Sequence, residues 1–401
     1  MRRPALRSLW SATLVILTIE LLDELVYGAQ GAALPVIRAD LNLNYEQIGL
    51  LLSVPALVGN ALEPALGILG DVWKRKALIV GGGLVFALAL AIIGFSQTFI
   101  ALLVGFVIFY PAGGAFVSLS QATLMDLNPG RHEQMMARWT LFGSVGVVGG
   151  SLLVSGGLAL GWGWRALYLG FAVFALALVA LIWSQRAAHA SVTDTFQEAD
   201  VTAGFRAGVV SALRALSDRN ILRWLILLEL CNLILDIFLE FAPLYFTDVV
   251  QVTTAEAALA VTVLSVAGLV GGFFIIPLLE RVRGLTYLRW SALLVLMVYA
   301  ALLATPVVGL KYILLAVVGL LTAGWYAIVR GQLYSAMPGQ SGTSMALSSV
   351  AAMAAGVTPW LLGLAAENFG LEWAMVLLAL GPIGLLVGIP RARQPLPESA
   401  V

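Results

Sequence analysis

Apolar runs alternate with short polar turns along the whole chain. Each run is long enough to cross a membrane as a helix, which takes roughly 20 residues. We predict twelve such helices, at residues 10–36, 47–69, 77–95, 98–123, 139–160, 165–184, 223–247, 257–279, 287–306, 312–334, 344–366 and 372–389. The polar interval 187–222 separates the sixth from the seventh, and it carries Phe205, Val209, Leu213 and Leu216 at helical spacing. That spacing predicts an amphipathic helix on the membrane surface within an all-α polytopic membrane protein.

Three carboxylates, Glu20, Asp23 and Glu24, interrupt the first apolar run. At about 100° per residue, these acids and Tyr27 lie on one face of the helix. Carboxylates at this depth in a bilayer are costly and normally face a protein interior or an aqueous cavity. The first helix is therefore predicted to carry part of a substrate or ion site.

The seventh run repeats this theme with Asn232, Asp236 and Glu240 on one face. The tenth run places Tyr326 and Arg330 on a common face, and Arg330 is the only basic residue that we assign to the interior of a span. Acids outnumber basic groups in the spans, which predicts a negative cavity suited to protons, metal ions or organic cations.

The acids could serve either proton coupling or the binding of a metal cargo. Crowded carboxylates repel one another when ionised, which favours the uptake and release of protons. Asp23 and Asp236 lie nearest the middle of their spans, so we expect them to carry the coupling ion H⁺. If the cargo is instead a divalent metal ion, Asp23, Glu24, Asp236 and Glu240 would supply its oxygen ligands. Tyr27 and Tyr326 would offer aromatic surface to an organic cation.

Composition narrows the class of protein. The 401 residues are 61% hydrophobic and 11% charged, with zero net charge, which indicates a membrane protein and no nucleic-acid partner. The single cysteine, Cys231, excludes a cysteine metal cluster. The sequence has no nucleotide-binding loop, so we expect an ion gradient to supply the energy and no cofactor to be required.

Basic residues predict the orientation in the membrane. With the N-terminus inside, the outer side keeps only Arg38, Arg165 and Lys311, and the other arginines and lysines gather on the inner side or near it. By the positive-inside rule, both termini are predicted to be cytoplasmic in a bacterial inner membrane.

The two halves of the chain repeat in parallel at an offset of about 208–209 residues. The matched positions are Pro35 with Pro243, Asp40 with Asp248, Pro129-Gly130 with Pro338-Gly339, and Gly161 and Trp164 with Gly370 and Trp373. This repeat predicts two pseudo-symmetric six-helix bundles, at residues 1–186 and 223–401, joined by the linker 187–222.

The loop after the second helix reads Gly67-Ile-Leu-Gly-Asp71-Val-Trp-Lys-Arg75-Lys76. With the twelve spans and the repeat, it resembles the signature loop of the major facilitator superfamily, G-x-x-x-D-R-x-G-R-[RK]. Val72 and Lys74 depart from that pattern. The resemblance implies a transporter that works by alternating access, with Asp71 and Arg75 in gating.

We therefore expect a secondary active transporter, monomeric and surrounded by lipid, that exports a small cationic or amphipathic solute in a proton-coupled manner. A divalent metal cation transporter and the uptake of a small metabolite remain alternatives. A membrane-embedded receptor or an enzyme would require a sensory domain or a nucleophile–base pair, and the sequence shows neither.

Overall fold

The computed structural model describes the chain except for residues 1–2, 73–74, 129–131, 185–217, 337–350 and 391–401. The described part is helical and contains no strand. Its first half comprises α1 (Arg3–Leu41), α2 (Tyr45–Val72), α3 (Arg75–Phe95), α4 (Phe99–Gly113), η1 (Gly114–Ser118), α5 (Leu119–Leu127), α6 (His132–Ala159) and α7 (Trp164–Ser184). Its second half comprises α9 (Arg219–Asn232), η3 (Leu233–Ile237), α10 (Phe238–Asp248), α11 (Thr254–Arg281), α12 (Gly284–Ala304), α13 (Val308–Thr322), α14 (Trp325–Ala336), α16 (Thr358–Phe369), α17 (Leu371–Leu377) and α18 (Leu380–Gly388).

Eight helical stretches of the described chain are long and apolar enough to cross a membrane. Helix α1 and the segment from α9 to α10 are not among them, and both carry the acids noted in the sequence. The predicted amphipathic helix at residues 205–216 lies outside the described residues. Helix α9 begins at Arg219, a few residues before the boundary predicted at residue 223.

Two segments that the periodicity predicts as unbroken α-helices contain a short π-helical turn. The first, η1, separates α4 from α5, and the second, η3, separates α9 from α10. Pro111 lies just before η1 and has no N–H for the α-helical ladder, and Gly113 and Gly114 follow it without side chains. π-Turns are rare and often occur at functional sites. Asp236 belongs to η3, so one of the predicted site residues lies on such a turn.

Other long spans also differ from straight helices. The predicted span 312–334 is divided between α13 and α14, because Gly324 has a φ of +80°, a conformation that favours glycine. The last span is divided between α17 and α18. Helix α1 continues past residue 36 to Leu41 with Pro35 inside it.

Helices α1 and α6 pack closely because α6 presents glycines to α1. A Cβ atom added to Gly150 would lie 2.0 Å from the Leu25 carbonyl oxygen, and one added to Gly146 would lie 2.7 Å from the Leu21 carbonyl oxygen. On the other side, a Cβ on Gly28 would lie 2.2 Å from the Val147 carbonyl oxygen. Small residues at such crossings let helix backbones approach in a membrane. This crossing fixes the face of α1 that carries the acids.

Replacing Gly150 by alanine is expected to destabilise the protein, because the new methyl group meets backbone that cannot rotate away. Overpacking of this kind costs on the order of 1–3 kcal/mol. Gly156 on the same helix is the matched control, since its Cβ would have no atom within 4 Å. Thermal unfolding of the purified variants should show a lower midpoint for Gly150→Ala than for Gly156→Ala. Equal midpoints would contradict the close crossing of α1 and α6.

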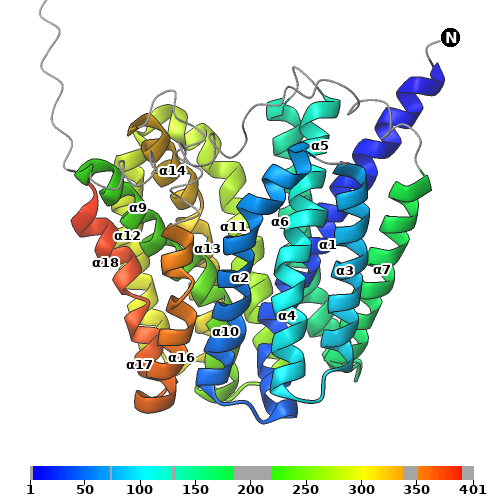
Figure 1. Ribbon diagram of the computed structural model, residues 1–401. Helices are drawn as coiled ribbons and strands as arrows, with labels where there is room; N and C mark the ends of the chain where they lie inside the picture. The colour runs from blue at the N-terminus through cyan, green and yellow to red at the C-terminus, as the bar shows by residue number, and fades with distance from the viewer. Residues whose placement is uncertain (1–2, 73–74, 129–131, 185–217, 337–350, 391–401) are drawn as a thin grey trace, which may run out of the picture.

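The first half (α1 to α7) and the second half (α9 to α18) lie side by side, in blue to green and in green to red (Figure 1). Within the first half α1 packs on α6, α3 on α7 and α2 on α4, and within the second half α11 packs on α13 and α12 on α18. Between the halves, α2 packs on α16, α6 on α11 and α1 on α10. The acidic faces of α1 and of the segment η3–α10 therefore meet at the boundary between the halves.

Candidate functional site

A cavity of about 570 Å³ lies at this boundary, and both acidic faces line it. Helix α1 contributes Asp23, Glu24, Tyr27 and Gln30; α4 and η1 contribute Phe109, Tyr110, Gly113, Gly114, Val117 and Ser118; α6 contributes Val147; η3 and α10 contribute Asp236 and Leu239. Its volume is within the range of roughly 300–1,000 Å³ that is usual for small-molecule sites. We call it the acidic cavity, since three of its lining residues are carboxylates and none is basic.

The carboxylates in the acidic cavity lie close to one another. Glu24 is near enough to Asp23 and Asp236 for their charges to interact, although Asp236 lies on the other half of the chain. Tyr27 lines the same cavity and is near enough to Glu24 and Asp236 to feel their charges. Carboxylates that share one cavity repel one another when ionised, so the cavity favours the binding of a cation.

Glycines bring the acids of α1 against their neighbours. A Cβ on Gly143 would lie 2.8 Å from Oε1 of Glu20, and one on Gly113 would lie 3.8 Å from Oδ1 of Asp23. Glu20 is 7% exposed and packs against α6, beside the acidic cavity. The glycine at position 113 thus places Asp23 beside the backbone that leads into η1.

Gln30 is a lining residue that the sequence analysis did not single out. It is 2% exposed, and its side chain lies against the Tyr110 hydroxyl. Gln30 and Tyr110 therefore add uncharged hydrogen-bonding groups to the wall of the acidic cavity. The sequence contains one indication that Gln30 belongs to the site, because it follows Asp23 by seven residues and so lies on the same helical face.

Glu63 of α2 is connected to the acidic cavity through a hydrogen bond from Ser118. The Ser118 hydroxyl, which lines the cavity, donates a hydrogen bond to Oε1 of Glu63 at 3.1 Å. Glu63 is exposed, so this bond links the cavity to a carboxylate outside it.

Other predicted site residues lie elsewhere. Glu240 is on α10, with its Cα 4.0 Å from the position of a Cβ on Gly31 of α1, but it is not among the lining residues. Asn232 lines a different cavity, where its Nδ2 donates to Oε2 of Glu229 at 3.3 Å. Tyr326 and Arg330 are on α14, with the Arg330 guanidinium 5.3 Å from the centre of the Tyr326 ring.

Of the two predicted gating residues, only Arg75 has a side chain within the described part of the chain. Arg75 opens α3 and has an interaction partner, whereas the side chain of Asp71, near the end of α2, lies outside the described part of the chain. For the metal alternative, the described residues contain no group of three His, Cys, Asp or Glu side chains arranged to hold a metal ion.

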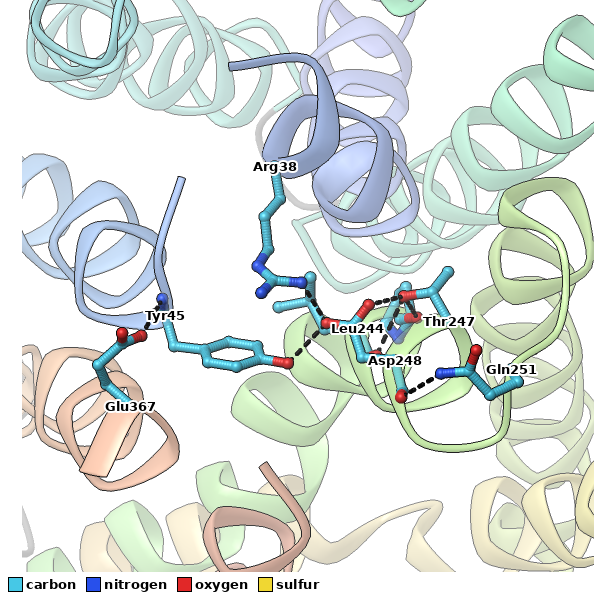
Figure 2. Close-up of polar contacts among 8 residues, drawn as sticks. Arg38, Tyr45, Leu244, Thr247, Asp248, Gln251 and Glu367 are labelled. Carbon is cyan, nitrogen blue, oxygen red and sulfur yellow. Dashed lines mark hydrogen bonds and ion pairs between the residues drawn. The ribbon is translucent and has the colours of Figure 1, made fainter. Parts of the chain in front are cut away.

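The two halves are bonded together at the end of the molecule where α1 leads into α2. Figure 2 shows Arg38 of α1 paired with Oδ2 of Asp248 on α10, and the Tyr45 hydroxyl donating to the same oxygen at 2.6 Å. The Tyr45 N–H donates to Oε2 of Glu367 on α16 at 2.9 Å, and the Arg38 guanidinium stacks 4.1 Å from the centre of the Tyr45 ring. We call Arg38, Tyr45, Asp248 and Glu367 the α1–α2 latch.

Close helix crossings extend this contact into the molecule. A Cβ on Gly363 would lie 2.3 Å from the Tyr45 carbonyl oxygen, and the Trp360 N–H donates to the Ser53 hydroxyl at 2.9 Å. Between α6 and α11, the Thr262 hydroxyl donates to Ser151 Oγ at 2.9 Å. The halves are therefore closed against each other at this end.

Asp40 is the repeat counterpart of Asp248, but it bonds within its own half. It pairs with Arg165 of α7 and accepts a hydrogen bond from Trp164 Nε1 at 3.2 Å. Arg165 also donates from Nη2 to the Ser96 carbonyl at 2.8 Å. Only one of the two equivalent acids thus joins the halves.

The sequence matches the profile described as Major Facilitator Superfamily over residues 16–357. The chain belongs to the Major Facilitator Superfamily. It is a multi-pass integral membrane transporter of small molecules with an alternating-access fold, and it is not an enzyme.

Solved structures of other superfamily transporters share the fold over nearly the whole chain. A bacterial homologue of the human lysosomal transporter Spinster, in an inward-facing and unoccupied conformation, has a TM-score of 0.74 at 15% identity and covers 97% of this chain and 96% of its own. The nucleoside transporter NupG has a TM-score of 0.73 at 12% identity and covers 95% of this chain and 98% of its own. No curated protein matches the sequence. At these identities the similarity concerns the fold alone.

Proposed function

We propose that this chain is a proton-coupled exporter of small cationic or amphipathic solutes, and that the acidic cavity is its substrate and proton site. The observation that carries the proposal is the meeting of Asp23 and Glu24 with Asp236 around one cavity without a basic lining residue. A cation is attracted there and competes with protons for the same carboxylates. Binding a cation then releases a proton, which is the exchange that proton-driven export requires.

We propose the same membrane topology that the sequence predicts. Twelve crossings form two six-helix bundles, residues 1–186 and 223–401, with residues 187–222 between them and both termini in the cytoplasm of a bacterial cell. In that orientation the α1–α2 latch faces the outside. Its ion pair and hydrogen bonds support assigning this conformation to a state closed on the outer side, and Asp71 and Arg75 to the inner gate.

The test is a ligand-stabilisation screen of the purified protein at pH 6 and pH 8, with cationic, neutral and anionic compounds in parallel. We expect organic cations such as ethidium to raise the unfolding temperature, and more strongly at pH 8, because fewer protons occupy the carboxylates there. Stabilisation by anions alone would contradict a site organised by the acids. Stabilisation by divalent metal ions alone would favour the metal-transport alternative, and stabilisation by neutral metabolites such as nucleosides would favour uptake.

A further inference from the structure

A second cavity, of about 670 Å³, lies wholly within the second half. It is bounded by α9, η3, residues 351–355, α16, α17 and the start of α18. Hydrocarbon side chains and alanines form nearly all of its wall, and the polar exceptions are Glu229, Asn232 and Thr358. We call it the apolar cavity.

The apolar cavity opens on the outer surface of the helices. Its lining residues Leu222, Ile226, Leu361, Leu377 and Leu380 are between 41% and 54% exposed. Large exposed hydrophobic side chains on a membrane-spanning protein face hydrocarbon chains of lipid. A molecule dissolved in the bilayer can therefore reach this cavity without passing through water.

The sequence offers a reason for this opening in the second half. At the repeat offset of 209 residues, the α6 glycines Gly143, Gly146, Gly149 and Gly150 correspond to Ala352, Ala355, Thr358 and Pro359. In the first half those glycines let α1 and α6 touch backbone to backbone. In the second half these positions carry larger residues, α16 packs on α2 and α17, and Ala355 and Thr358 line the apolar cavity.

The π-turn η3 forms the wall between the apolar and the acidic cavities. Leu233 and Ile237 line the apolar cavity, whereas Asp236 of the same turn lines the acidic one. One turn earlier, Glu229 brings a carboxylate to the apolar cavity, hydrogen-bonded to Asn232. The apolar cavity thus combines room for a hydrocarbon chain with an anionic group on the side of the protein interior.

We propose that the apolar cavity binds the hydrocarbon chain of a single-chain cationic amphiphile that enters from the bilayer, with its ammonium head at Glu229. A chain that leaves lipid for an apolar wall gains little, because lipid is as apolar as leucine. The head therefore determines which amphiphile binds, and a charge-assisted contact with Glu229 selects a cation. Delivery of that head to Asp236 rests on the proposed export function, whereas binding in the apolar cavity does not.

Photo-crosslinking of the full chain in lipid nanodiscs tests this assignment. The probes are hexadecylamine and hexadecanol, each with a diazirine in the middle of the chain, and the labelled residues are located by mass spectrometry. We expect label on residues of α9, η3 and positions 351–362. The amine should label at least about tenfold more than the alcohol at equal membrane concentration, as a hydrogen bond to a charged group predicts.

Variants in the wall of the apolar cavity test whether the probes bind there. Ala355→Phe fills the space and should abolish this label, whereas Ala180→Phe, on the exposed surface of α7, should leave it unchanged. Glu229→Gln should remove the preference for the amine and retain the label. If Ala355→Phe is unstable, Ala354→Leu in the same wall replaces it. Label spread evenly over the lipid-facing surface, or equal label from both probes, overturns the proposal.

The same preparation separates this proposal from export. Ethidium carries no long chain and serves as the probe for the acidic cavity, with its effect measured in Glu229→Gln as well as in the wild type. Selective label with no ethidium stabilisation would retain the amphiphile site and reject the acidic cavity as the cation site. Ethidium stabilisation without selective label would do the reverse.

Discussion

Replacing Asp23 or Asp236 by asparagine is expected to abolish transport driven by a pH gradient while leaving the protein folded. Both carboxylates line the acidic cavity, one from each half of the chain. Asparagine keeps the size of the side chain but can neither bind nor release a proton. It also removes a like charge from a crowded site, so thermal stability should stay equal or rise. We expect a fall of at least about a hundredfold, similar to that for loss of an essential acid–base group.

Proteoliposomes with an imposed pH gradient and ethidium as the transported probe provide the measurement. Glu46→Gln, an acid-to-amide change in the first turn of α2, is the matched control and should keep wild-type uptake. In lightly buffered solution, ethidium binding should release protons from the wild type and fewer from either cavity variant. Wild-type uptake by both Asp23→Asn and Asp236→Asn would end the assignment of proton coupling to these residues.

Breaking the α1–α2 latch should have the second largest effect, this time on the balance between conformations. Asp248→Asn removes the ion pair with Arg38 and weakens the bond from Tyr45. The Arg38 and Asp248 side chains are 27% and 25% exposed, so water screens the pair only in part. The loss is on the order of 1–3 kcal/mol, which changes a two-state population roughly 5- to 150-fold. The end of the molecule that carries the α1–α2 turn should open more often.

Cysteine labelling at that end measures the change. The chain has one cysteine, the buried Cys231, so Cys231→Ser followed by a cysteine at Gln47 gives a single reporter beside the latch. The labelling rate of this cysteine should rise in Asp248→Asn. It should return to the wild-type rate in the double variant Arg38→Asp, Asp248→Arg, which restores the ion pair. Asp40→Asn is the control, because the equivalent acid bonds to Arg165 inside one half. Equal labelling in Asp248→Asn and Asp40→Asn would show that the latch does not hold this end closed.

The acidic face of α1 could be predicted from spacing alone. Asp23, Glu24 and Tyr27 lie where an unbroken α-helix places them, and the structure brings all three to one cavity. The spacing of Asn232 and Asp236 assumed the same regular helix. The π-turn η3 changes the angle between successive residues, so Asn232 lines the apolar cavity while Asp236 lines the acidic one. Nothing in the local sequence around Asp236 marks that turn in the way that Pro111 and two glycines mark η1.

Contacts between distant parts of the chain could not be predicted. Arg38 was recognised as a basic residue of the outer side and Asp248 as a repeat position, but the pair is 210 residues apart. This ion pair forms only because the two halves pack against each other, and the periodicity of the sequence does not predict that packing. The same holds for Ser118 and Glu63, which belong to different helices. Side-chain patterns indicate which face of a helix is buried, whereas the partner of that face depends on tertiary packing.

The different partners of Asp40 and Asp248 have a consequence for biosynthesis. The ribosome makes the first half before the second, and Asp40 finds Arg165 and Trp164 within that first half. Asp248 emerges later, when Arg38 and Tyr45 are already in the membrane. The first half can thus pair Asp40 with Arg165 by itself, whereas Arg38 gains its partner only when the second half docks. The order in which the two acids gain their partners is then the order in which the chain is translated.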